Sequence, residues 1–202
     1  MIRLGLIRHA MTQWNFEKKI QGREDIKLNP EGMSQAAAWG KILSPEKFDL
    51  ILSSTMIRAQ QTAQIISEKI NVVVEYDIDL REQDFGEWEG KKIKDIRKNN
   101  PNQIEAQESR GWQFCPPGGE SRINILNRTS GAIENAAQKF DNKYILIVTH
   151  NSVIKTLIYK VMDRKFIPGE PALLKDYHLH TLVFDKTLEI ERLNSVNLRD
   201  CL

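Results

Sequence analysis

Two adjacent basic side chains end the first apolar run of the sequence. Residues 2–7 are IRLGLI, and Arg8 and His9 follow directly. A guanidinium at the end of a buried strand is costly unless an anion meets it. Since a neutral histidine is also a nucleophile, the pair indicates a site that binds and accepts an anionic group such as a phosphoryl group.

Three further candidates follow other strand-like runs. Arg58 comes after residues 48–54, His150 ends the run 143–150, and Glu82 comes shortly after the stretch NVVVEYD. Ligands of open α/β sheets bind beyond the carboxyl ends of the strands, so these side chains can converge on one pocket. The arginines would bind phosphate oxygens, a histidine would attack phosphorus, and the carboxylic acid would protonate the departing oxygen. Because the arginines supply the positive charge, we expect neither a metal nor a cofactor.

The elements that must position these residues are those of an α/β fold. The runs at 2–7, 48–54 and 143–150 are rich in Leu, Ile and Val without alternation, which is typical of parallel strands covered on both faces. Residues 177–185 and 188–194 predict a terminal hairpin. Apolar residues at helical spacing predict four helices, over residues 30–43, 57–70, 121–140 and 152–162. We therefore expect one domain over residues 1–202, with a largely parallel central sheet flanked by helices.

Residues 84–120 differ from the rest of the chain because polar and turn-forming residues dominate. This composition predicts a short, cap-like insertion with one short helix and long loops. His178 and His180 alternate on a predicted strand and share a face. No third ligand is apparent, so we favour ordinary packing over a two-histidine metal site.

Composition excludes several classes of protein. Lys plus Arg is 29 and Asp plus Glu is 27, so the near-balanced charge indicates neither nucleic acid nor a membrane surface as partner. No apolar run reaches the ~20 residues of a membrane span, and no secretory signal is apparent. The distant Cys115 and Cys201 indicate neither a disulfide framework nor a zinc site. We expect a cytoplasmic protein whose oligomeric state stays open, a homodimer being one alternative.

Five segments, in order, resemble the motifs of the histidine phosphatase superfamily, which has the phosphoglycerate-mutase-like fold. They are LIRHAMTQWN, QGREDIKLNPEGMSQA, SSTMIRAQQTA, LREQDFGEWEG and VTHNSVIK. The family patterns are LxRHGxTxxN, QGxxDxPLTxxGxxQA, SSxxxRAxQTA, LxExxFGxWEG and (V/S)(T/S)HGxxIR. Each match alone is weak, but five in register are highly specific.

The resemblance implies a role for each candidate. His9 would be the nucleophile that forms a phosphohistidine, and Glu82 would be the general acid and then the base for water. The phosphoryl group and its transition state would be held by Arg8, Arg58 and His150. Four further positions match residues that line the phosphate pocket: Asn15, Gln21, Gly22 and Asn151. Ala10 and Asn151 stand where glycine is common, and neither change removes a group with a chemical role.

The resemblance implies a metal-independent phosphomonoester hydrolase that acts on a small phosphorylated metabolite. FGEWEG and the modest insertion favour the phosphatase branch, which includes α-ribazole phosphatases and broad-specificity phosphatases. The nearest alternative is a phosphoglycerate mutase, which passes the phosphoryl group to a second hydroxyl instead of water. Two others are a non-catalytic binder of phosphorylated ligands and a regulatory protein that uses the surface near Trp112 and Phe114.

Overall fold

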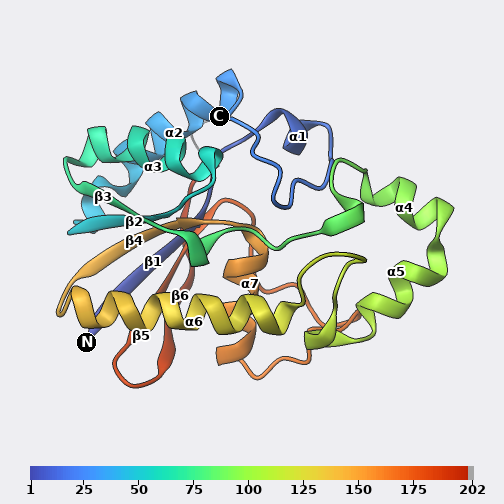
Figure 1. The fold of residues 1–202 in the computed structure, drawn as a ribbon. Helices are drawn as coiled ribbons and strands as arrows, with labels where there is room; N and C mark the ends of the chain where they lie inside the picture. Colours follow the sequence, from blue (N-terminus) through green and yellow to red (C-terminus); the bar gives the residue numbers. More distant parts are fainter. Residues whose placement is uncertain (200–202) are drawn as a thin grey trace.

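A six-stranded sheet forms the centre of the molecule, with strand order β3-β2-β4-β1-β5-β6 (Figure 1). In the computed structural model, which describes residues 1–199, the strands are β1 (Ile2–Arg8), β2 (Leu50–Ser54), β3 (Val73–Asp77), β4 (Tyr144–Thr149), β5 (His178–Phe184) and β6 (Leu188–Asn197). The first four strands are parallel, whereas β5 and β6 form an antiparallel hairpin at one edge. The largely parallel sheet and the terminal hairpin are both confirmed.

The four long helices are also where the sequence predicts them, with ends that agree to within one residue. The helices are α1 (Gln13–Phe16), α2 (Pro30–Leu43), α3 (Ile57–Ile70), α4 (Ile93–Asn99), α5 (Pro101–Glu108), α6 (Arg122–Lys139) and α7 (Asn151–Val161). Helix α2 shows why its start was predictable: Asn29 is the N-cap and accepts a hydrogen bond from the Gly32 amide, and Pro30 occupies the first turn.

Helices cover both faces of the sheet. Helices α2 and α3 lie on one face, and α6 and α7 lie on the other (Figure 1). Side chains of β1 alternate between the two layers: Leu4 and Leu6 pack with α6 and α7, whereas Ile7 packs with α2 and α3. Both faces are therefore apolar, which is why the strand sequences show no alternation.

The insertion contains two helices, so the expectation of one short helix with long loops was wrong. Helix α4 ends at Asn99 and α5 begins at Pro101, because proline opens a helix but disfavours helical geometry in the residue before it. A small separate core holds the two helices together, formed by Trp88, Ile96, Ile104 and Phe114. We call residues 84–120 the cap. Trp112 packs edge-on against Phe166, so neither aromatic suggested as a partner surface is free of internal contacts.

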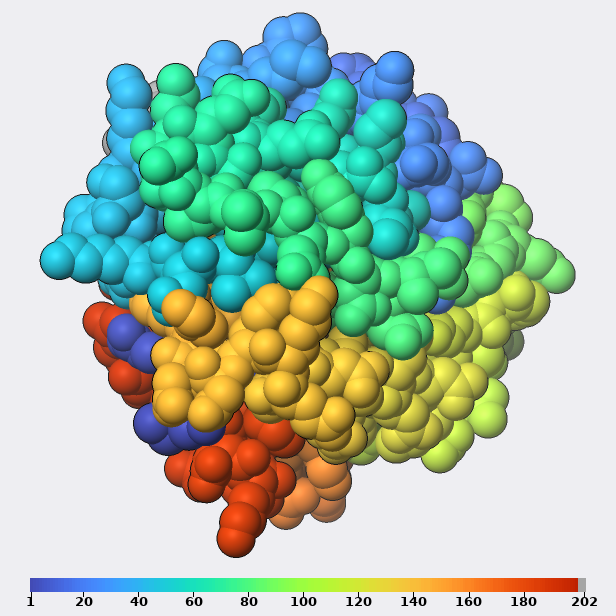
Figure 2. Space-filling model, turned by 60° about the vertical axis from the view of Figure 1, so that its left-hand side comes forward, coloured from blue at the N-terminus to red at the C-terminus, as the bar shows by residue number. Residues whose placement is uncertain are grey.

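The chain terminus Met1 lies at the ends of the strands opposite the predicted site (Figure 2). The Met1 amino group donates a hydrogen bond to the Asp141 carboxylate at 2.9 Å. Figure 2 shows this blue terminus between the orange segment near residue 140 and the red β5–β6 hairpin. The polar groups with candidate chemistry therefore gather at the other end of the sheet.

The described residues were also searched for metal sites and for helices that could span a membrane. His180 is buried, and its Nδ1 accepts a hydrogen bond from the Asn194 amide at 3.2 Å, as expected for a packed residue. No group of three potential ligands that could hold a metal ion occurs within residues 1–199. No helix within this range is long and apolar enough to cross a membrane. Cys115 is a free thiol, and Cys201 lies outside the described residues.

Two helical glycines give a matched test of the packing. A Cβ on Gly32 would lie 2.0 Å from the Met11 carbonyl oxygen, whereas a Cβ on Gly131 would have no atom within 4 Å. We expect Gly32→Ala to lower the free energy of unfolding by about 1–3 kcal/mol through overpacking. Gly131→Ala should raise it by about 0.5–1 kcal/mol, since alanine is the better helix former. Urea unfolding measures both; equal effects of the two substitutions would contradict the close contact at Met11.

Candidate active site

The parallel pairing of β1 with β4 brings the two candidate histidines together. Arg8 is opposite Thr149 in the register, so His9 and His150, which follow these residues, lie side by side with ring centroids 5.2 Å apart. The His9 amide donates a hydrogen bond to the Thr149 carbonyl at 2.9 Å, which fixes the two strand ends relative to each other.

Eight of the nine predicted residues line one cavity of about 150 Å³. They are Arg8, His9, Asn15, Gln21, Gly22, Arg58, Glu82 and Asn151. His150 is fully buried and contacts this group through its ring contact with His9. The sheet thus brings together residues that are distant in sequence, as the positions of the strand ends predict.

The environment of His9 leaves one ring nitrogen available for attack. Its Nδ1 lies 2.7 Å from the Ala10 carbonyl oxygen. Because a carbonyl can only accept, Nδ1 carries the proton and Nε2 keeps its lone pair. Burial, together with the charges of Arg58 and Arg8, holds the pKa of His9 well below its usual value. A neutral imidazole with a free Nε2 is the form that can attack phosphorus.

His150 is held from the neighbouring strand. Its Nε2 lies 2.8 Å from the Ser54 hydroxyl at the end of β2, and its Nδ1 is buried without a hydrogen-bond partner among the described residues. Burial is the main cause that lowers the pKa of His150, with contributions from Arg58, His9 and Arg8. The unpartnered nitrogen is a group that a ligand atom could satisfy.

The two arginines lack carboxylate partners. Arg58 is 0% exposed, and its guanidinium donates hydrogen bonds of 2.8 Å to the carbonyl oxygens of Gly22 and Glu24. Burial lowers the pKa of Arg58 to about 10. The Nε atoms of Arg8 and Arg58 are buried without a partner among the described residues. Carbonyl groups solvate the Arg58 guanidinium but do not neutralise it, and no carboxylate pairs with Arg8 among the described residues, so the cavity is suited to an anion.

Glu82 supplies the one candidate acid in the cavity. It is 8% exposed, and its Oε1 accepts a hydrogen bond from the Gln83 amide at 2.8 Å. A short 3₁₀ turn, Ile78–Leu80, joins it to the end of β3. The Thr149 hydroxyl donates to the Leu80 carbonyl at 2.8 Å and so connects this segment to β4.

The remaining wall of the cavity is built from the segment after β1. Thr12 and Asn15 form a reciprocal capping box at the start of α1, and the Thr12 hydroxyl also donates to the Gln21 side chain at 3.0 Å. Gly22 has φ +52°, and a Cβ there would meet the Glu89 carboxylate. The sequence analysis missed four lining residues: Lys19, Ile20, Phe85 and Ser152. Phe85 and Ser152 fall within recognised motifs, whereas Lys19 and Ile20 lie in the short stretch between the first two motifs.

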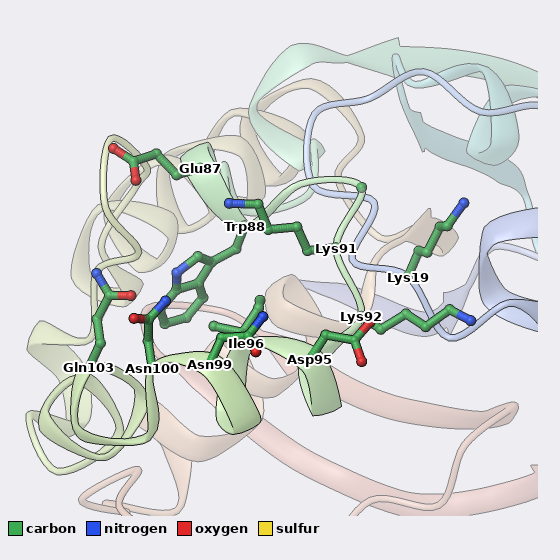
Figure 3. A pocket seen from close by; sticks show the side chains of 11 residues that line it. Lys19, Glu87, Trp88, Lys91, Lys92, Asp95, Ile96, Asn99, Asn100 and Gln103 are labelled. Atoms are coloured by element: carbon green, nitrogen blue, oxygen red, sulfur yellow. The ribbon is translucent and has the colours of Figure 1, made fainter.

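A larger cavity of about 410 Å³ lies against the cap (Figure 3). Figure 3 shows Trp88 in its wall, with Lys91 extending above the indole and Asn99 and Asn100 beside it. Lys19 lines both cavities, but none of the nine predicted residues lines the larger one. The candidate chemistry therefore belongs to the smaller cavity at the strand ends.

Comparison with known proteins identifies the family. Residues 4–194 match the histidine phosphatase superfamily (branch 1). The chain belongs to this superfamily. The uncharacterised phosphatase PhoE of Bacillus subtilis (strain 168) is 33% identical over 169 residues, which are 83% of this chain and 79% of that protein. Phosphoglycerate mutase-like protein 4 of Arabidopsis thaliana is 37% identical over 155 residues, which are 75% of this chain and 67% of that protein.

Solved structures of the superfamily have the same fold. YhfR of Bacillus stearothermophilus superposes with a TM-score of 0.87 at 28% identity, covering 98% of this chain and 99% of that one. The α-ribazole phosphatase of Shigella flexneri superposes with a TM-score of 0.78 at 26% identity, covering 96% of both chains. The superfamily and the α/β fold predicted from the motifs are confirmed.

The two neutral histidines predict how stability depends on pH. Their pKa values are depressed in the folded state, whereas in the unfolded chain they protonate below about pH 6.5. The unfolded state therefore binds more protons, and stability is lost as pH falls through this value. Between pH 6 and pH 5 we expect the free energy of unfolding to fall, by at most about 1.4 kcal/mol per pH unit for each histidine that stays neutral in the folded state.

Urea unfolding at pH 7, 6 and 5, followed by tryptophan fluorescence, measures this dependence. The double variant His9→Gln, His150→Gln serves as the comparison, because it lacks both titrating groups. We expect it to lose less stability on acidification than the parent protein. Identical slopes for the two proteins would show that the histidines are not held neutral by the fold.

Proposed function

We propose that this protein is a metal-independent phosphomonoester hydrolase that works through a phosphohistidine on His9. One observation carries the proposal: a buried imidazole with a free Nε2 lies beside two arginines that have no carboxylate partner. Such a site can bind a phosphoryl dianion and also present a nucleophile to it. Membership of the superfamily, and the phosphatase name of the Bacillus subtilis relative, support the same activity.

The first step transfers the phosphoryl group to the enzyme. Arg8 and Arg58 bind the phosphoryl oxygens, and the amide end of α7 at Asn151 adds the positive end of a helix dipole. The lone pair of His9 Nε2 forms a bond to phosphorus while the bond from phosphorus to the substrate oxygen breaks. Protonated Glu82 gives its proton to that oxygen, so the product leaves as a neutral alcohol.

The second step returns the enzyme to its starting state. Ionised Glu82 accepts a proton from a water molecule as the water oxygen bonds to phosphorus. The bond between phosphorus and Nε2 breaks, and inorganic phosphate leaves with His9 neutral again. The hydrogen bond from Nδ1 to Ala10 is retained throughout and keeps the ring oriented.

The substrate class is a small phosphorylated metabolite, since the lining of the cavity fits a single phosphoryl group and the alcohol it carries. A phosphoglycerate mutase is the second candidate, favoured by the name of the Arabidopsis thaliana relative, phosphoglycerate mutase-like protein 4. It would use the same residues and differ in whether water or a second hydroxyl receives the phosphoryl group. A cytoplasmic location and the oligomeric state, with a homodimer among the alternatives, stay predictions.

³¹P NMR with a panel of phosphomonoesters that includes 3-phosphoglycerate separates these two functions. We expect inorganic phosphate to accumulate, at a rate that EDTA does not change. His9→Ala should lower the rate about 10³-fold or more while phosphate binding persists, because both arginines remain. Formation of 2-phosphoglycerate without free phosphate would instead establish a mutase, and an active His9→Ala variant would exclude His9 as the nucleophile.

The role of Glu82 can be tested through the leaving group. Glu82→Gln should lower kcat/KM for an alkyl phosphate about 10²–10⁴-fold, because the alkoxide needs a proton as it leaves. p-Nitrophenyl phosphate should be much less affected, since p-nitrophenolate leaves without protonation. Steady-state kinetics on both esters measure the contrast. Equal losses for the two substrates would assign Glu82 a structural or binding role instead of proton transfer.

A further inference from the structure

An ion pair between the cap and α6 lies outside the cavity and has no part in the proposed reaction. Glu120, the last residue of the cap, precedes the N-cap of α6, and Arg128 is on that helix. Arg128 Nε donates to Glu120 Oε1 at 2.8 Å, and its Nη2 donates to Oε2 at 3.0 Å. Two parallel hydrogen bonds of this kind fix the plane of the guanidinium as well as its position.

The carboxylate of this pair is held in its ionised form. Its side chain is 15% exposed, and burial raises the pKa of Glu120. The guanidiniums of Arg128 and Arg23 outweigh burial and lower the pKa below its usual value. Arg23 contributes through an ion pair with Glu120 at 3.3 Å. Arg128 therefore faces a charged partner throughout the neutral pH range.

The fixed guanidinium also binds the segment that carries the candidate acid. Arg128 Nη1 donates to the Asp79 carbonyl, and Nη2 donates to the Glu82 carbonyl at 3.2 Å. Asp79 belongs to the short 3₁₀ turn after β3, and Glu82 follows two residues beyond the end of that turn. One side chain of α6 thus holds the main chain over residues 79–82, directly before and at the acid.

Glu120 binds the residues that follow the acid. Its carbonyl accepts a hydrogen bond from Gln83 Nε2 at 2.8 Å, and its amide donates to the Asp84 carbonyl at 2.9 Å. Gln83 is 2% exposed, and its own amide donates to Glu82 Oε1 at 2.8 Å. The amide that orients the Glu82 carboxyl is therefore itself positioned by contacts with Glu120.

The Glu82 carboxyl depends on these main-chain contacts. Within residues 1–199 the Gln83 amide is the only group that donates a hydrogen bond to it. No hydrogen bond from another part of this range therefore fixes the carboxyl, and its place follows from the path of residues 79–84. A general acid must lie within hydrogen-bond reach of the oxygen that it protonates, so a small shift of this path costs rate.

We propose that Arg128 and Glu120 are positioning residues that hold Glu82 where it can protonate the leaving oxygen. This inference rests on the proposed function and adds two residues that line no part of the catalytic cavity. Arg128 acts through its hydrogen bonds to the main chain before and at Glu82. Glu120 acts by fixing the guanidinium that makes those bonds and by holding Gln83.

The test uses the leaving group, because an effect that passes through Glu82 depends on it. Steady-state kinetics compare p-nitrophenyl phosphate with the alkyl ester of the ³¹P NMR panel that the parent protein hydrolyses fastest. Arg128→Met should lower kcat/KM for the alkyl ester about 10- to 100-fold, and for p-nitrophenyl phosphate less than about threefold. Arg128 is the residue to replace, because Glu120 also pairs with Arg23 beside the cavity wall.

A double-mutant cycle shows whether the loss passes through the acid. In a Glu82→Gln background, Arg128→Met should lower kcat/KM for the alkyl ester less than about threefold, because no proton donor is left to misplace. An equally large loss in both backgrounds would show that the arginine acts by another route and would overturn the proposal.

Two control variants separate positioning from charge and from stability. Arg128→Lys keeps the positive charge, but an ammonium cannot form the bidentate contact with Glu120, so we expect the same contrast between the two esters. This variant decides the question where urea unfolding shows that Arg128→Met does not fold. Arg122→Met removes another arginine of α6, which donates to the carbonyls of Gly111 and Phe166. It should change kcat/KM for both esters by the same factor.

Equal losses for the two esters in Arg128→Met would leave the arginine a structural role only and overturn the proposal. Full recovery of the alkyl ester rate in Arg128→Lys would also overturn it, since charge alone would then suffice. Failure of the proposed function is a separate result: the parent protein would release no phosphate from any ester, or Glu82→Gln itself would show equal losses for both esters.

Discussion

The burial of Arg58 without a carboxylate is the constraint on which the site depends. A guanidinium that is 0% exposed must be solvated by the protein, and here the carbonyls of Gly22 and Glu24 do so. The segment between α1 and α2 has to fold over the strand ends to supply them. The carbonyl dipoles solvate the guanidinium but carry no net negative charge. The folded protein therefore keeps a positive potential in the cavity, which favours the binding of an anionic ligand.

That potential has two effects that support the same chemistry. It would attract the phosphoryl dianion of the proposed substrate, and it disfavours protonation of the histidines that line or adjoin the cavity. A single arrangement of arginines therefore concentrates the electrophile and keeps the nucleophile in its reactive form. The arrangement has a cost in stability, because neutral buried histidines and uncompensated cations both weaken the folded state. Binding of the anion offsets this cost by mass action, since only the folded state binds it.

The sequence predicted the parts of the protein that follow from local pattern. Continuous apolar runs identified β1, β2 and β4, and capping at Asn29 identified the start of α2. The site residues were predictable because parallel strands end at one edge and because the motifs fall at those ends. The two helices of the cap were not predictable from the sequence. Helices α4 and α5 have only seven and eight residues and share a core of a few apolar side chains, so the helical spacing of apolar residues is too short to recognise.

The two parts of a phosphomonoester meet different kinds of structure in this protein. In the proposed reaction the phosphoryl group would be met by residues that follow strands of a sheet buried on both faces, so the sheet fixes their positions. The alcohol would be met by Phe85, which lines the cavity and belongs to the cap with its own small core. Substitutions in the cap can therefore change which alcohol fits without moving the groups that hold phosphorus.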